Sequence, residues 1–263
     1  MNRSARFAVT VLAFGYAFLY LPIALVILYS FNDSRLVTVW AGFSLKWWKA
    51  LAGNEAMLDA AWLSLRIGLV SATLATLLGL AAGYSLARVP RFRGRTLFAG
   101  LVIAPMVMPE VVMGISMLLL FVGSDRLFGG PERGFLTITA AHVTFSLSFV
   151  AIVVQARLAD FDRSLEEAAM DLGATPLMTF LTVTLPLIAP ALASGWLLAF
   201  TLSLDDLILT QFVSGAQSQT LPMRVYSSVR LGVDPQINVL ATLVVAVAAG
   251  ALVLSGWLTR RRT

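Results

Sequence analysis

The chain has 263 residues, of which 59% are hydrophobic and only 13% are charged, and its formal net charge is +5. Soluble domains carry about 25% charged residues, so this chain lacks the polar side chains to cover a water-facing surface, and a soluble fold is excluded. It has no cysteine, one histidine and no lysine followed by serine or threonine, which excludes disulfides, thiolate and histidine-cluster metal sites and a GxxxxGK[ST] phosphate loop.

Six segments are long and apolar enough to cross a hydrocarbon core of ~30 Å, which takes about 20 residues of helix. In chain order they are residues 7–30, 67–87, 96–124, 134–156, 187–212 and 236–258. The first is too long for a signal-peptide core and no A-x-A site follows it, so we expect a retained helix. The sequence shows no soluble domain or internal repeat. We therefore predict an all-α membrane protein with one transmembrane domain over residues 1–263.

Two tryptophans, Trp47 and Trp48, lie between the first two spans, and each is next to a lysine. Tryptophan is common in the aromatic belts at membrane interfaces, which is one interpretation of the pair. The other is a cation–π contact with a bound ammonium group, worth about 0.5–2 kcal/mol. The residues alone leave both interpretations open.

Arginines gather at both ends of the chain and between spans two and three. They are Arg3, Arg6, Arg88, Arg91, Arg93, Arg95, Arg260, Arg261 and Arg262. Because arginine and lysine concentrate in cytoplasmic loops, both termini are predicted to be cytoplasmic. With six spans, the segment 157–186 then lies on the same side of the membrane.

Three acidic residues fall inside predicted spans. Glu110 lies in span three between Pro105 and Pro109, and Asp205 and Asp206 are neighbours in span five. At 1.5 Å per residue, Glu110 and Asp205 both fall in the outer half of the membrane. An acidic residue at the centre of a span costs about 2.5–3.5 kcal/mol, so an unpaired one generally has a task, and these three suit a cation arriving from outside.

The alternative for these acids is structural. They could cap helix ends, or they could pair with an arginine near a span, namely Arg66, Arg224 or Arg230. Ser203, two residues before Asp205, is a further candidate for the substrate pathway. His142 lies in the apolar span four, and we interpret it as a hydrogen-bonded packing residue rather than a ligand or a proton relay.

The segment 157–186, before span five, is polar and interrupted. Leu165, Ala168, Ala169 and Leu172 recur at helical spacing, which predicts a short helix with an apolar stripe. Gly173 is placed to end this helix in a left-handed conformation. Thr175-Pro176 is placed to begin the next helix, and Leu185-Pro186 marks the entry to span five. From these features alone, the segment is a water-exposed helical hairpin that connects two spans.

The same segment resembles the EAA signature of binding-protein-dependent ABC importer permeases. That signature reads E-A-A, three residues, G, nine residues, I, one residue, L-P. Here Glu167, Ala168, Ala169, Gly173 and Leu185-Pro186 match it, and Val183 replaces isoleucine. In that family the loop forms a cytoplasmic coupling helix that docks on a separate ATPase subunit. The resemblance implies that Glu167, Ala168, Ala169 and Gly173 carry the docking, and that the permease architecture is that of type I importers with six spans.

A second likeness covers nearly the whole chain. The stretches 30–51, 104–121, 195–215 and 221–233 resemble the polyamine importer permeases, in particular the second permease subunit of putrescine importers. The resemblance implies a bacterial inner-membrane subunit that moves putrescine or a related polyamine by alternating access. It also implies that residues matching Glu110, Asp205, Asp206 and Trp47 handle the substrate.

The partners implied are a second, different permease subunit, two ATPase subunits and a soluble polyamine-binding protein. ATP and magnesium would bind to the ATPase, so this chain would hold no cofactor and would not itself be an enzyme. Lipid is its solvent, and no nucleic-acid partner is expected.

Two other functions compete with this one. An ion-coupled secondary transporter or a cation channel could use Glu110, Asp205 and Asp206 as a relay. The lack of internal repeats and the EAA segment both count against it. An intramembrane enzyme is the third possibility. A single histidine excludes a metalloprotease, no motif supports a serine-type site at His142, and two neighbouring aspartates on one helix do not converge as an aspartyl site requires.

Overall fold

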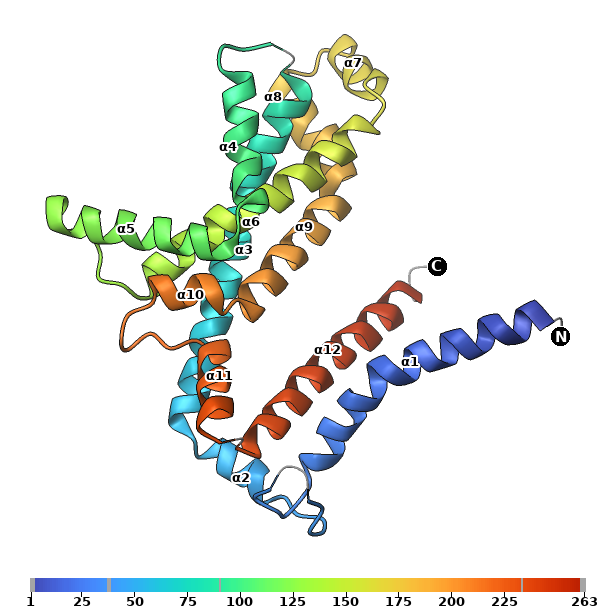
Figure 1. Cartoon of the computed structure of the whole chain (residues 1–263). Coiled ribbons are helices and arrows are strands. Elements are labelled where there is room, and N and C mark those ends of the chain that lie inside the picture. Colours follow the sequence, from blue (N-terminus) through green and yellow to red (C-terminus); the bar gives the residue numbers. More distant parts are fainter. Residues whose placement is uncertain (1–2, 37–38, 90, 233, 261–263) are drawn as a thin grey trace. The chain divides into compact units, whose positions relative to one another are not determined.

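The computed structural model describes residues 3–36, 39–89, 91–232 and 234–260, and its elements there are helices joined by short loops (Figure 1). The predicted Arg261 and Arg262 of the carboxyl end lie outside the described residues. The chain divides into two units, one made of Met1–Asp59 with Val225–Thr263 and the other of Ala60–Arg224. The prediction of a single domain over 1–263 stays a prediction.

The first unit is built from α1 (Arg3–Tyr29), α2 (Lys46–Ala52) and α12 (Gln236–Arg260), with the beginning of α3 (Glu55–Arg88) and the end of α11 (Leu221–Leu231). α12 contacts both α1 and α2. The α1–α2 loop is organised by Asn32, which is 2% exposed and bonds to the backbone of Val39 and Ala41. The side chains of 7–25 on α1 face outward almost throughout, as expected of a helix whose neighbours are lipid or another subunit.

The second unit holds most of α3 with α4 (Arg95–Val107), α5 (Glu110–Phe128), α6 (Phe135–Ala159) and α7 (Ser164–Asp171). After these come α8 (Pro176–Thr179), a π-helical turn (Phe180–Thr184), α9 (Leu185–Asp205) and α10 (Ile208–Val213). Among the described residues, five helical segments are long and apolar enough to cross a membrane: α1, α3, α5, α6 and the run Pro176–Asp205. The all-α membrane fold class is confirmed, and the six predicted spans correspond to α1, α3, α4 with α5, α6, α9 and α12.

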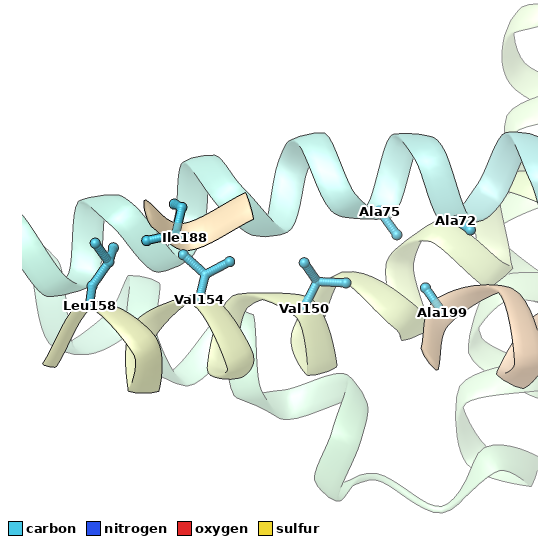
Figure 2. Close-up of a cluster of buried hydrophobic side chains, with 7 residues drawn as sticks. All are labelled: Ala72, Ala75, Val150, Val154, Leu158, Ile188 and Ala199. Atoms are coloured by element: carbon cyan, nitrogen blue, oxygen red, sulfur yellow. The ribbon is translucent and has the colours of Figure 1, made fainter. Parts of the chain in front are cut away.

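The core of the second unit lies where α3, α6 and α9 meet. Figure 2 shows that this cluster combines the small side chains Ala72, Ala75 and Ala199 with branched side chains of α6. Small residues let helices approach closely, which is how membrane helices pack without a hydrophobic driving force. At Gly83 on α3 the helices are too close for any side chain, because a Cβ there would lie 2.6 Å from the carbonyl oxygen of Ala151.

Gly83→Ala is therefore expected to lower the free energy of unfolding by about 1–3 kcal/mol, since the atom it meets belongs to the backbone and does not move aside easily. The measurement is thermal unfolding of the purified chain in detergent. Gly100→Ala on α4 is the matched control, because nothing lies within 4 Å of the added Cβ. Equal melting temperatures for the two variants would contradict this account of the α3–α6 contact.

Two predicted spans are interrupted, and both corrections concern candidate site residues. The span expected over 96–124 is broken, because α4 ends at Val107 and α5 begins at Glu110. Proline disfavours the helical conformation in the residue before it, and Met108, which precedes Pro109, has a ψ of 139°. Figure 1 shows α5 running across the direction of α4. Glu110 therefore lies at a helix start and not in the middle of a span.

The span expected over 187–212 is wrong at both ends. The helical run already begins at Pro176, passes through the π-helical turn and ends at Asp205. Asp206 is extended, with φ −66° and ψ 122°, and α10 begins two residues later. The side chain of Asp206 accepts hydrogen bonds from the backbone N–H groups of Leu209 and Thr210, so it caps a new helix instead of continuing the old one.

Candidate functional site

The predicted coupling segment folds locally as the sequence indicates. Ser164 begins α7 and donates its backbone N–H to Asp162 Oδ1 at 3.0 Å, and hydrogen bonds from Ser164 lower the pKa of the Asp162 carboxyl. After α7 the chain turns at Gly173, whose φ of +91° is strained for any other residue. Thr175 Oγ1 then accepts from Met178 N at 3.3 Å and caps α8. Gly173 and Thr175 end and begin the helices as predicted.

The outer surface of this segment is apolar and uncovered. Leu172 is 90% exposed and Leu165 is 49% exposed, and Ala168 is exposed between them. Glu167 is also exposed, and it forms no ion pair within the part of the chain that the structure describes. Three of the residues assigned to docking by resemblance, Glu167, Ala168 and Gly173, thus lie on an open surface, while Ala169 is half-buried.

A second glutamate of α7 points the other way. Glu166 Oε2 lies 3.1 Å from Arg88 Nε, and Glu166 Oε1 accepts from Thr184 Oγ1 at 2.7 Å. Sequence reasoning missed this contact, because 78 positions separate the two charged residues and no spacing pattern links them. The only available signal was an arginine at the end of an uncharged span.

The other site is a chain of buried polar side chains in the second unit. His142 Nδ1 lies 2.6 Å from Ser203 Oγ, and His142 Nε2 lies 3.2 Å from Asp206 Oδ2 and 2.9 Å from Thr210 Oγ1. Ser71 Oγ donates to Ser203 Oγ at 3.1 Å. The network thereby joins α3, α6, α9 and α10. His142, Ser203 and Thr210 are 2%, 6% and 0% exposed, so water does not compete for these bonds.

One assignment of the protons satisfies every atom of this network. The Ser203 hydroxyl donates to Nδ1 of a neutral His142, whose Nε2–H then points at Asp206 and Thr210. Thr210 donates its hydroxyl to Asp206 Oδ2 at 2.5 Å and its backbone N–H to the same oxygen at 2.7 Å. The interpretation of His142 as a hydrogen-bonded packing residue agrees with this geometry.

Ser203, His142 and Asp206 are linked in the order found in a hydrolytic triad. The burial of Ser203 is inconsistent with hydrolysis. A nucleophile must be reached by its substrate, and Ser203 is 6% exposed with its oxygen already accepting from Ser71. The carboxylate of Asp206 accepts hydrogen bonds from the backbone at the start of α10, where it caps that helix. The structural alternative considered for the acids, a helix cap, holds for Asp206.

Asp205 and Glu110 differ from Asp206. Both are exposed on the surface of the chain, at the last residue of α9 and the first of α5. Within the described ranges, neither carboxylate has a hydrogen-bond or ion-pair partner on another residue. Arg66, one of the alternative partners, lies instead over the ring of Phe135 at 5.1 Å. Of the predicted pathway residues, the structure brings together Ser203 and Asp206 and leaves Glu110 and Asp205 free.

Trp47 belongs to the first unit, on α2. It lines a cavity of about 760 Å³ together with Arg35, Lys46, Asp234 and Gln236. The Lys46 ammonium lies 4.9 Å from the Trp47 ring centroid, so a cation–π contact already exists within the chain. The Trp47 indole N–H is buried without a hydrogen-bond partner among the described residues.

The chain is similar to known transport proteins over most of its length. Residues 75–261 match the model of the family described as "Binding-protein-dependent transport system inner membrane component". The chain is 53% identical over 250 residues to the putrescine transport system permease protein PotI of Escherichia coli K12, covering 95% of this chain and 89% of that one. It is 41% identical over 248 residues to the spermidine/putrescine transport system permease protein PotC of the same organism, covering 94% and 92%.

Solved structures share the fold. A bacterial ABC transporter involved in the import of the acidic polysaccharide alginate matches with a TM-score of 0.71 at 16% identity, over 100% of this chain and 99% of that one. The MetNI methionine ABC transporter, in inward-facing conformations, matches with a TM-score of 0.59 at 18% identity, over 78% and 94%.

Proposed function

The chain belongs to the family of binding-protein-dependent transport system inner membrane components, and from that premise we propose that its cargo is a small polyamine, putrescine first. It is a multi-pass inner-membrane permease subunit of an ABC importer and not an enzyme. The observation that carries the choice of cargo is the 53% identity to a putrescine permease over 95% of this chain. The ion-coupled transporter is disfavoured by the same family membership.

The partners proposed are a second permease subunit, two ATPase subunits with their ATP and magnesium, and a soluble polyamine-binding protein. The chain has no phosphate loop of its own, so the energy for transport has to enter from outside it. Both termini are proposed to be cytoplasmic, with α7 on the same side. In an alternating-access cycle, ATP binding would close the ATPase subunits and α7 would pass the motion to the membrane helices.

Within the proposed pathway, the acids take different tasks. Glu110 and Asp205 are the candidates for contact with the ammonium groups of the cargo, because both are exposed and unpaired among the described residues. An unpaired carboxylate inside a membrane costs about 2.5–3.5 kcal/mol, which a cationic cargo would offset. Ser203 and Asp206 position the end of α9 through their contacts with His142 and do not contact the cargo in this proposal. Trp47 stays a proposed contact on the outer side.

The coupling assignment is tested by Glu167→Arg. Glu167 is exposed on α7, so reversing its charge is not expected to disturb the fold of this chain. We expect the variant to retain less ATPase subunit after purification and to lose at least about tenfold in ATP-driven uptake, equivalent to about 1.4 kcal/mol of coupling. Co-purification of the ATPase and uptake into proteoliposomes are the measurements.

Asp160→Arg, which makes the same charge reversal at another exposed position of the segment, is the control for Glu167→Arg. Normal ATPase retention together with normal uptake in Glu167→Arg would remove Glu167 from the docking surface.

A further inference from the structure

The ion pair between Arg88 and Glu166 is largely buried, and Arg88 has several further partners. Its side chains are only 9% and 13% exposed, although they lie at the end of a membrane helix and on a short surface helix. The Arg88 guanidinium also lies 5.3 Å from the ring centroid of Phe161, and its Nη1 donates to the carbonyl oxygen of Leu158 at 3.2 Å. Arg88 Nε is close to Glu166 without hydrogen-bond alignment, so the contact is an ion pair by distance.

This pair joins four elements at one point. Arg88 ends α3, Leu158 belongs to the last turn of α6, and Glu166 lies in the first turn of α7. Thr184, which donates to Glu166 at 2.7 Å, is 1% exposed and ends the π-helical turn before α9. One carboxylate and one guanidinium therefore connect α7 to the ends of α3 and α6 and to the π-helical turn that leads into α9.

A second contact repeats the link between the same segments. Arg163, just before α7, donates Nη2 to the carbonyl oxygen of Ala87 at 3.2 Å, one residue before Arg88. That carbonyl belongs to the last turn of α3, where helix carbonyls lack intrahelical partners. Two side chains of the α7 segment, Arg163 and Glu166, thus contact the end of α3.

The neighbouring glutamates divide two tasks between them. Glu167 is exposed and open to a partner, whereas Glu166 is turned into the chain. We propose that the Arg88–Glu166 pair fixes α7 to the ends of α3 and α6 and to the π-helical turn that leads into α9, so that movement of α7 moves these membrane helices with it. Arg88 and Glu166 are positioning residues in this proposal, which rests on the proposed function of the chain as an ATP-driven permease.

The test uses the complete transporter in proteoliposomes and compares polyamine uptake with ATP hydrolysis. Glu166→Gln keeps an oxygen for Thr184 and removes only the charge. We expect hydrolysis to continue and the number of polyamine molecules imported per ATP to fall by roughly five- to tenfold. Asp171→Asn removes a charge from an exposed position on the same helix and is expected to leave that ratio unchanged.

Exchanging the charges of Arg88 and Glu166 distinguishes a positioning role of the pair from a general loss of stability. Arg88→Glu alone places two acids together and is expected to lose coupling, and adding Glu166→Arg is expected to restore part of it. A Glu166→Gln transporter with the wild-type ratio of uptake to hydrolysis would overturn the proposal. If wild type itself shows no ATP-driven uptake, the proposed function fails instead, so the two failures are distinguishable.

A distance measurement tests the same contact without depending on the transport assay. The chain contains no cysteine, so spin labels can be placed in it at Asp171→Cys on α7 and Arg91→Cys beyond α3. In the assembled transporter, a narrow distance distribution is expected with the ion pair intact and a broad one in Glu166→Gln. A distribution that stays narrow would overturn the proposal, whatever the uptake shows.

Discussion

Replacing Asp205 with asparagine is expected to reduce ATP-driven polyamine uptake by at least about tenfold, while the chain remains folded and assembled. Asp205 is the last residue of α9, is exposed, and has no hydrogen-bond or ion-pair partner on any other described residue. In the asparagine variant an ammonium group bound at this position would lose its counter-charge, and each 1.4 kcal/mol of lost interaction is about a factor of ten in affinity. Initial uptake rates at several putrescine concentrations provide the measurement.

The conservative variant and a distant one complete the Asp205 experiment. Asp205→Glu keeps the charge and is expected to retain part of the uptake. Asp125→Asn, which neutralises an exposed acid near the end of α5, is expected to behave as wild type. Wild-type uptake in Asp205→Asn would assign the cation contact to other residues, with Glu110 the next to test.

Asp206→Ala should have the opposite profile, with a loss of stability as its primary effect. The carboxylate accepts from the backbone N–H groups of Leu209 and Thr210 and from the Thr210 hydroxyl, and it faces His142 Nε2. Each buried donor left without an acceptor costs about 1–3 kcal/mol, so the summed loss is comparable with the whole stability of a domain. We expect a lowered melting temperature and a low yield of purified protein.

Comparing the melting temperatures of Asp205 and Asp206 variants tests the structural role of Asp206. Asp206→Asn retains one acceptor oxygen and is expected to be less destabilising than Asp206→Ala. Asp205→Ala removes the same group one position away and is expected to melt close to wild type. If Asp206→Ala melts as wild type does while uptake falls, Asp206 is a cargo contact and the network through His142 is not what holds the α9–α10 turn.

Much of the fold follows from the apolar pattern of the sequence. Each predicted span has a helix at its place, because a membrane leaves backbone polar groups no partner other than their own helix. The breaks were not predicted. Proline can kink a helix, so Pro109 is compatible with a bend, but a full interruption also requires Met108 to be extended. At Asp206 the apolar residues 207–209 continue the span pattern, and only the capping bonds of the side chain reveal that the helix ends.

The site was predictable where it is local. Gly173 and Thr175 specify their own backbone geometry, so the shape of the coupling segment could be derived from neighbouring residues. The contacts of Glu166 with Arg88 and of His142 with Ser203 join residues 78 and 61 positions apart. Such pairs depend on how helices pack, which residue spacing within one helix does not determine.

In the function proposed above, this chain passes polyamines through the membrane with energy from a separate ATPase. The most direct measurement is putrescine uptake into proteoliposomes that contain the chain with its partner permease, ATPase and binding protein. We predict uptake that requires ATP, the ATPase subunit and the binding protein, and that continues when the proton gradient is collapsed. Uptake that proceeds without ATP and follows an imposed proton gradient would contradict the account.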